Sequence, residues 1–133
     1  KKLQLEKLVF ATNFREETGQ TFKIVENLAE ILQVKLKILY VNTPTYFLET
    51  NDIMSIGKTF LSQYANYEHE INIIDAFKEE RGIIQYGEKI DADGIAVITS
   101  GKSDLKQYFS PSVTENLIGL TEMPVISIKI LKK

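Results

Sequence analysis

Five short apolar runs alternate with amphipathic stretches along the chain, and this alternation is the feature that most constrains its fold. Most of these runs are predominantly apolar rather than apolar at every second residue, which is typical of strands buried on both faces of a parallel sheet. We expect strands at residues 8–12, 36–41, 68–74, 94–99 and 125–130. Helices are expected at 22–32, 52–65, 77–89 and 112–120, and residues 13–17 carry the start signal of the first helix. The pattern predicts an α/β domain with a five-stranded parallel sheet, helices on both faces and right-handed crossovers.

The composition indicates an ordinary globular domain. Its 133 residues are 44% hydrophobic and 26% charged, so we expect a single domain over residues 1–133. Sixteen Lys and Arg against eighteen Asp and Glu give a net charge of −2, which offers no general attraction for nucleic acid or a membrane surface. The apolar runs are far shorter than the roughly 20 residues of a membrane helix, and the absence of cysteine favours a cytoplasmic location.

Side chains suited to catalysis or metal binding are scarce. His69 is the only histidine, and a lone histidine flanked by Glu68 and Glu70 in the expected third strand is more often packed or solvated than catalytic. Asp91 and Asp93 precede a strand, where short polar side chains favour a turn over a metal site. We therefore expect neither catalysis nor a bound metal.

The segment Gly101–Ser103, GKS, carries the last three residues of the phosphate-binding P-loop pattern. That pattern also needs a glycine five positions earlier, where backbone N–H groups curl around the phosphates, and the residue there is Ala96. The match fails at its first residue. The segment nevertheless lies in the longest expected connection, 100–110, which follows the carboxyl end of a strand, and open α/β sheets bind ligands at that edge.

Four segments resemble the universal stress protein family, in the family's order and in the expected structural positions. Residues 10–14, FATNF, are similar to its ATDF start, and residues 91–97, DADGIAV, to its fourth strand. Residues 112–116, SVTEN, and 123–128, MPVISI, are similar to its ending, S-V-x-E-N followed by C-P-V-x-x-V. The resemblance covers nearly the whole chain and implies the strand order 3-2-1-4-5 of a Rossmann-like, adenine nucleotide alpha hydrolase-like fold.

Members of this family that bind ATP carry G-x-x-G, followed by nine residues and G-[ST]. The three glycine positions are Ile98, Gly101 and Pro111 in this chain, with Ser112 next, so one glycine and the hydroxyl remain. Glycine lets a phosphate approach the backbone, whereas Ile98 adds a branched side chain and Pro111 removes an N–H. The family's acidic residue after the first strand is Asn13 here. These departures predict weak ATP binding.

What remains of the family's site is a degenerate nucleotide pocket, which the resemblance implies to consist of Ala11, Thr12, Asn13, Val41, Gly101, Lys102, Ser112 and Val113. Lys102 can reach a phosphate as a flexible cation, and Ser112 can stand at a helix N-terminus, where free N–H groups favour anions. A structural alternative explains the same residues. Ser112 with Glu115 fits a capping box, Pro111 fits the first turn of a helix, and Lys102 is then a solvated cation.

The resemblance implies a regulatory or stress-response domain that acts by dimerisation and protein contacts, binds no cofactor and has no robust ATP binding. The alternative is a nucleotide sensor that accepts ATP or AMP in the reshaped pocket. Slow nucleotide hydrolysis ranks last, because no base or metal constellation is visible.

The last expected strand, Val125–Ile130, is the surface through which we expect a homodimer. Its sequence VISIKI places Ile126, Ile128 and Ile130 on one face, and in the implied strand order it lies at an open edge with Lys129 as its one charge. Universal stress proteins commonly dimerise along this strand. Alternatively, the three isoleucines serve the monomer core alone, and the edge is covered by residues 131–133 or by a second domain in tandem.

Overall fold

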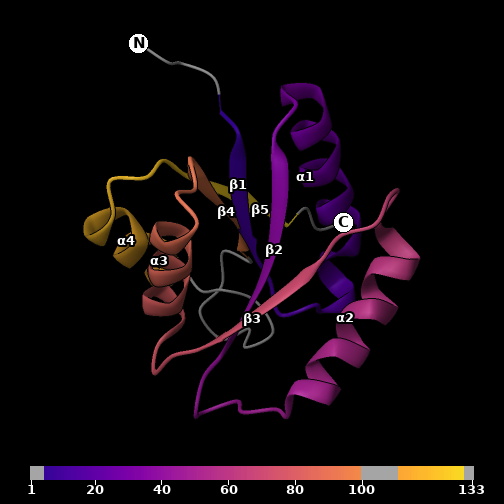
Figure 1. Cartoon of the computed structure of the whole chain (residues 1–133), viewed down its shortest axis with the longest axis horizontal. Coiled ribbons are helices and arrows are strands. Elements are labelled where there is room, and N and C mark those ends of the chain that lie inside the picture. The colour runs from indigo at the N-terminus through magenta and orange to yellow at the C-terminus, as the bar shows by residue number, and fades with distance from the viewer. Residues whose placement is uncertain (1–4, 100–110, 131–133) are drawn as a thin grey trace.

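The computed structural model describes residues 5–99 and 111–130, with the backbone alone for 111–114. Its elements are β1 (Lys7–Ala11), a short 3-10 turn (Glu16–Thr18), α1 (Gly19–Leu32), β2 (Lys35–Asn42), α2 (Thr50–Tyr64), β3 (Ile71–Asp75), α3 (Glu79–Lys89), β4 (Gly94–Thr99), α4 (Pro111–Leu120) and β5 (Val125–Lys129). The strands form one parallel sheet in the order β3-β2-β1-β4-β5 (Figure 1). The predicted fold class and strand order are confirmed.

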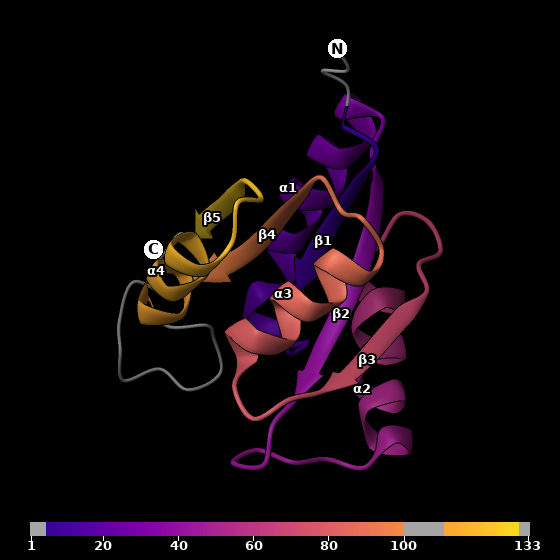
Figure 2. The same ribbon diagram turned by 60° about the vertical axis from the view of Figure 1, so that its left-hand side comes forward.

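Helices α1 and α2 cover one face of the sheet, and α3 and α4 cover the other (Figures 1 and 2). Side chains of β1 alternate between the two layers, so Phe10 packs under α1 and α2 while Val9 packs under α3 and α4. Within the first layer the ring centroid of Phe22 lies 5.5 Å from those of both Phe10 and Phe60. These contacts join β1, α1 and α2 through one aromatic cluster.

The predicted turn before β4 is confirmed. Asp91 has a φ of 57°, the left-handed region that aspartate tolerates better than most residues. The Asp93 carboxylate accepts hydrogen bonds from the backbone N–H groups of Glu6, at 2.8 Å, and Lys7, at 3.0 Å. The two aspartates therefore form a turn and fasten the start of β4 to the start of β1.

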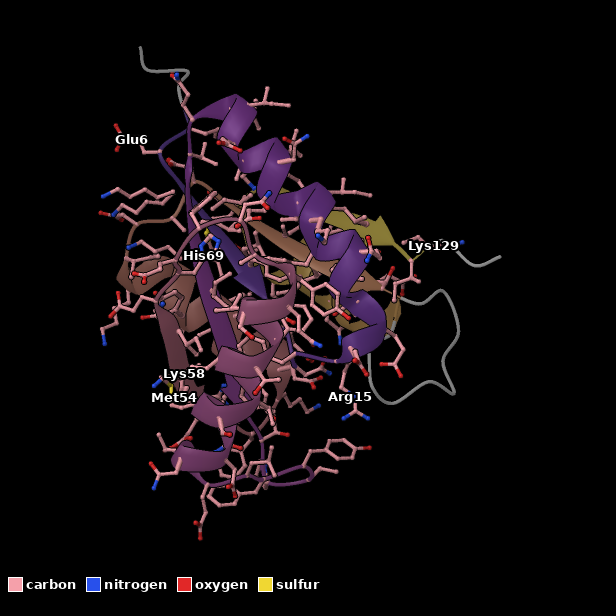
Figure 3. The ribbon with its side chains drawn as sticks, turned by 90° about the vertical axis from the view of Figure 1, so that its right-hand side faces the viewer. Glu6, Arg15, Met54, Lys58, His69 and Lys129 are labelled. Carbon is pink, nitrogen blue, oxygen red and sulfur yellow. The ribbon has the colours of Figure 1, made fainter. Side chains whose placement is uncertain are left out.

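The third strand starts later than the sequence predicts, and the placement of His69 in a strand was wrong. β3 begins at Ile71, so His69 lies in the connection after α2, on the side of the sheet that α1 and α2 cover (Figure 3). The cause is Glu26, whose carboxylate accepts the backbone N–H of Asn66 at 3.0 Å and lies 2.7 Å from His69 Nε2. With the His69 and Glu26 side chains 3% and 1% exposed, this contact holds the connection against α1 instead of extending the strand.

Helix α3 also starts two residues later than expected, at Glu79 instead of residue 77. Helix α4 begins at Pro111, in agreement with the prediction of a first-turn proline, which lacks an N–H that would have no partner there. In the described part of the chain, no helix is long and apolar enough to cross a membrane.

We expect Glu26→Ala to destabilise the fold, because the N–H of Asn66 and the ring of His69 would lose their buried acceptor. Each buried donor left unsatisfied costs about 1–3 kcal/mol, so the free energy of unfolding in urea should fall by roughly 2–5 kcal/mol. Glu26→Gln keeps one oxygen acceptor and is the matched control, for which we expect a clearly smaller loss. An equal loss in both variants would show that these hydrogen bonds do not stabilise the connection.

Candidate functional site

The candidate site lies at the carboxyl ends of β1 and β2, next to the β1/β4 pair at which the order of the strands reverses. The chain leaves β1 through Thr12, whose backbone N–H donates to Leu39 O at 2.9 Å and whose hydroxyl accepts the N–H of Phe14 at 3.0 Å. Phe14 has a φ of 60°, which is strained for an aromatic residue, and its ring packs against Tyr40 and Phe60. This tight turn leaves Asn13 half-buried at the edge of the sheet.

A cavity of about 320 Å³, which we call the β1–β2 cavity, opens beside this turn. Three of the residues predicted from the sequence line it together: Thr12, Asn13 and Val41. Its volume is at the lower end of the range for small-molecule sites, roughly 300–1,000 Å³. The structure thus brings these three candidates into one site.

The other predicted site residues are placed differently. Ala11 is buried in the layer under α3 and α4. Gly101 and Lys102 lie outside the described residues, while Ser112 and Val113 belong to the first turn of α4 with only their backbone described. Three of the eight predicted pocket residues therefore line one cavity, and the phosphate part of the pocket stays a prediction.

One expectation about the phosphate half needs correction. We expected Ile98 to add a branched side chain against a bound phosphate, but Ile98 is a residue of β4 and pairs with Ile128 of β5. Its side chain is 4% exposed and packs in the core under α1. Hydrophobic packing of the strand accounts for this residue, and changing it to glycine would open the core rather than a binding loop.

Sequence reasoning missed the other eight residues that line the β1–β2 cavity, among them Arg15, Tyr40 and Glu79. Burial raises the pKa of the Tyr40 hydroxyl, and the charge of Arg15 partly opposes this rise. Burial also raises the pKa of Glu79, with a further rise from the neighbouring carboxylate of Glu80. Sequence signals could have found two of these three residues, since Arg15 lies two residues after Asn13, and Glu79 starts the helix after the carboxyl end of β3.

Glu80 and Asn116 form a partly buried polar contact that the sequence also did not reveal. Asn116 Nδ2 donates to Glu80 Oε2 at 3.1 Å, and Glu80 is buried between α3 and α4. Asn116 is the last residue of the SVTEN segment, so part of that motif holds the two helices together. Among the described residues, no group of three His, Cys, Asp or Glu side chains could hold a metal ion.

The family model of the universal stress protein family matches residues 4–129. The chain belongs to this family. Among solved structures, this universal stress domain is similar to a universal stress protein in complex with cAMP, with a TM-score of 0.71 and 14% identity over 97% of this chain and 100% of the other. A search with the sequence among curated proteins finds no match.

Two further structures support the same fold. The universal stress protein from Archaeoglobus fulgidus in complex with dAMP has a TM-score of 0.64 and 18% identity, over 96% of this universal stress domain and 100% of the other chain. The protein UspA from Lactobacillus plantarum has a TM-score of 0.66 and 15% identity, over 96% of this domain and 100% of the other chain. At these identities, the similarity establishes the shared fold.

Glu79→Gln should stabilise this universal stress domain at neutral pH. The raised pKa means that the folded state holds this proton more tightly than the unfolded state, so stability is lost as the pH rises through the folded pKa. Below a pH of about 4 the carboxyl is protonated in both states, and the gain of the variant should vanish. Urea unfolding at a series of pH values measures the difference in free energy of unfolding between Glu79→Gln and the wild type. A difference that does not change with pH would contradict this assignment.

Proposed function

We propose that this chain is a regulatory stress-response domain of the universal stress family, which acts as a homodimer through β5 and by contacts with other proteins, without tight ATP binding. The observation that carries the proposal is the edge position of β5, which pairs with β4 on one side. We further propose a single domain in the cytoplasm, in keeping with the absence of cysteine.

The backbone of β5 presents hydrogen-bonding groups to the open edge. Ile95 N–H donates to Pro124 O, and Ile130 N–H donates to Thr99 O, both at 2.9 Å, so the even-numbered residues turn their backbone groups toward β4. Because backbone groups alternate along a strand, those of Val125, Ser127 and Lys129 face away from β4. These are the groups through which a second copy of the strand would pair.

The side chains of β5 add apolar surface next to that edge. Ile126, Ile128 and Ile130 pack against the core under α1, yet each stays half-buried. A partner strand related by a two-fold axis would extend the sheet and cover more of these side chains. Lys129 is exposed near the outer margin of β5 (Figure 3) and is the one charge within the strand.

Weak ATP binding is supported by the chemistry of both halves of the site. Asn13 removes the negative charge that the family carries after β1, and Pro111 has no N–H to offer a phosphate. Loss of one hydrogen bond to a charged group weakens binding by about 1.5–3 kcal/mol, or roughly ten- to a hundredfold.

A nucleotide sensor is the second candidate function, favoured by the β1–β2 cavity. Thr12, Asn13 and Val41 line it together, and exposed Arg15 on the same cavity offers a cation for a phosphate group. The similar structures that contain cAMP and dAMP show that this fold accommodates adenine nucleotides in other proteins. AMP, with its smaller charge, is then the better ligand for a site that has lost part of its phosphate contacts.

We expect the purified chain to be a dimer in light scattering coupled to size exclusion, at tens of micromolar. Ser127→Pro removes an N–H at the centre of the open edge and should shift the equilibrium toward monomer. Ser127→Ala keeps that N–H and is the matched control, which should stay dimeric.

A wild-type monomer would overturn the proposed dimer. It would favour the alternatives, in which the isoleucines of β5 serve only the core of the monomer or a second domain covers the edge. This chain covers 44% of a universal stress protein from Archaeoglobus fulgidus, a length that leaves space for a second domain of this size in that protein. A dimer that survives Ser127→Pro would place the interface elsewhere on the molecule.

For ATP we expect a dissociation constant in the high micromolar range or weaker, on the order of 5 kcal/mol of binding free energy. Calorimetry with ATP and magnesium, and with AMP in parallel, measures it. A low-micromolar value for ATP, or adenine nucleotide that stays bound through purification, would contradict the first function and support the sensor. Pro111→Gly tests the lost donor, and a gain in affinity would show that this position limits phosphate binding.

A further inference from the structure

A second and larger cavity lies beside the β1–β2 cavity, at the same edge of the sheet. Its volume is about 600 Å³, and it is formed where the connection from β2 to α2 meets the connection from β3 to α3. Figures 1 and 2 both show these two connections as neighbours at the carboxyl ends of the strands. Phe47 lines both cavities, whereas Thr12, Asn13 and Val41 line only the smaller one, so we call the larger one the β2–β3 cavity.

The walls of the β2–β3 cavity are fixed by hydrogen bonds from the last residue of β2. Asn42 Nδ2 donates to Leu48 O at 2.8 Å, and Asn42 Oδ1 accepts the N–H of Leu48 at 3.1 Å, which closes the segment 43–48 into a compact loop. The backbone oxygen of Asn42 accepts the N–H of Ala76 at 3.1 Å and ties the end of β3 to the same point. A site built in this way needs little ordering when a ligand binds.

Helix α3 closes the remaining side because it approaches β2 very closely. A Cβ on Gly82 would lie 2.7 Å from Val41 Cγ1, so only glycine permits this approach. The neighbouring Arg81 and, one turn later, Gln85 thereby come to line the cavity. Glycine at this position therefore helps to bring a cation to the cavity.

The chemistry of the lining is aromatic with one charge of each sign. Phe47 and Phe77 are 62% and 78% exposed, which leaves a large apolar surface uncovered beside the cavity. Asp75 and Arg81 supply a carboxylate and a guanidinium, and neither of these side chains takes part in a hydrogen bond or ion pair with another described residue. The cavity thus offers an aromatic surface and two opposite charges that are free to bind a ligand.

We propose that the β2–β3 cavity binds a small aromatic zwitterion, of which a free aromatic α-amino acid is the simplest example. Its ring packs on Phe47 and Phe77, its ammonium group faces Asp75, and its carboxylate faces Arg81, which can hold it in a bidentate pair. A purely anionic or cationic ligand would satisfy one of these charges and be repelled by the other. A nucleotide fits poorly, because its phosphate would bring two negative charges near Asp75.

The test uses L-phenylalanine as the probe, with two matched analogues, in NMR titrations of the full chain. 3-Phenylpropionate lacks the ammonium group, and phenethylamine lacks the carboxylate. We expect L-phenylalanine to perturb the signals of residues 75–85 and to bind at least about fivefold more tightly than either analogue, since each analogue loses one charge-assisted contact at a partly exposed site. Equal binding of all three, or no binding of L-phenylalanine up to about 10 mM, would overturn the proposal.

Variants of exposed residues assign each contact without disturbing the core. Arg81→Gln should weaken L-phenylalanine and 3-phenylpropionate but strengthen phenethylamine, which loses a repulsive charge. Asp75→Asn should weaken L-phenylalanine and phenethylamine but strengthen 3-phenylpropionate. Phe77→Ala should weaken all three ligands. Tyr46→Ala is the control, since Tyr46 is also an exposed aromatic residue but lines only the β1–β2 cavity. If Tyr46→Ala abolishes binding while Phe77→Ala does not, the ligand occupies the β1–β2 cavity and the proposal is wrong.

Discussion

The rest of the structure depends on the burial of β1 from both faces and along both edges. Its residues 8–11 are all buried, and the strand pairs with β2 on one side and β4 on the other. A strand in this position cannot satisfy its backbone groups with water, so both neighbours must be present and in register. The same pairing puts the turn at Thr12 between two strands whose connections run to opposite faces. The strand order reverses at the β1/β4 pair, and the β1–β2 cavity opens next to this pair, at the carboxyl ends of β1 and β2.

From that central strand, polar side chains shape the edge of the sheet. Thr12 fixes the turn after β1, and Asn42 fixes the loop after β2, each through hydrogen bonds to backbone groups of the connection that follows. These short-range bonds leave the aromatic side chains of the loop, above all Phe47, exposed between two cavities. A small number of buried polar groups thus holds a large apolar surface open to ligands.

Much of the fold could be predicted from the sequence because apolar runs mark buried strands directly. The turn at Asp91 and the proline at the start of α4 could also be predicted, because both follow from local backbone chemistry. The late start of β3 was not predicted, because it depends on Glu26. This residue lies 43 residues before His69 in the chain and leaves no periodic signal. The role of Ile98 beside a phosphate was misjudged because a motif was given more weight than the strand that contains this residue.

The candidate site could be predicted only in part. Thr12, Asn13 and Val41 were implied by the family resemblance, and they line one cavity because they lie at the ends of two paired strands. Glu79 joins them only through the packing of α3 against the sheet. The β2–β3 cavity was missed altogether, because its walls come from two loops that meet through long-range contacts of Asn42.

The two edges of the sheet differ in a way that favours β5 for pairing. β3, at the other edge, ends in Asp75 and is preceded by Glu70, so two antiparallel copies would bring carboxylates toward one another at both ends. Two copies of β5 paired about Ser127 would set each Lys129 opposite a Val125 and keep the two cations at opposite ends of the ladder. Like charges thus oppose self-association at one edge and not at the other. The asymmetry leaves the cavities near β2 and β3 open to ligands in a dimer joined through β5, since they lie on the far side of the sheet.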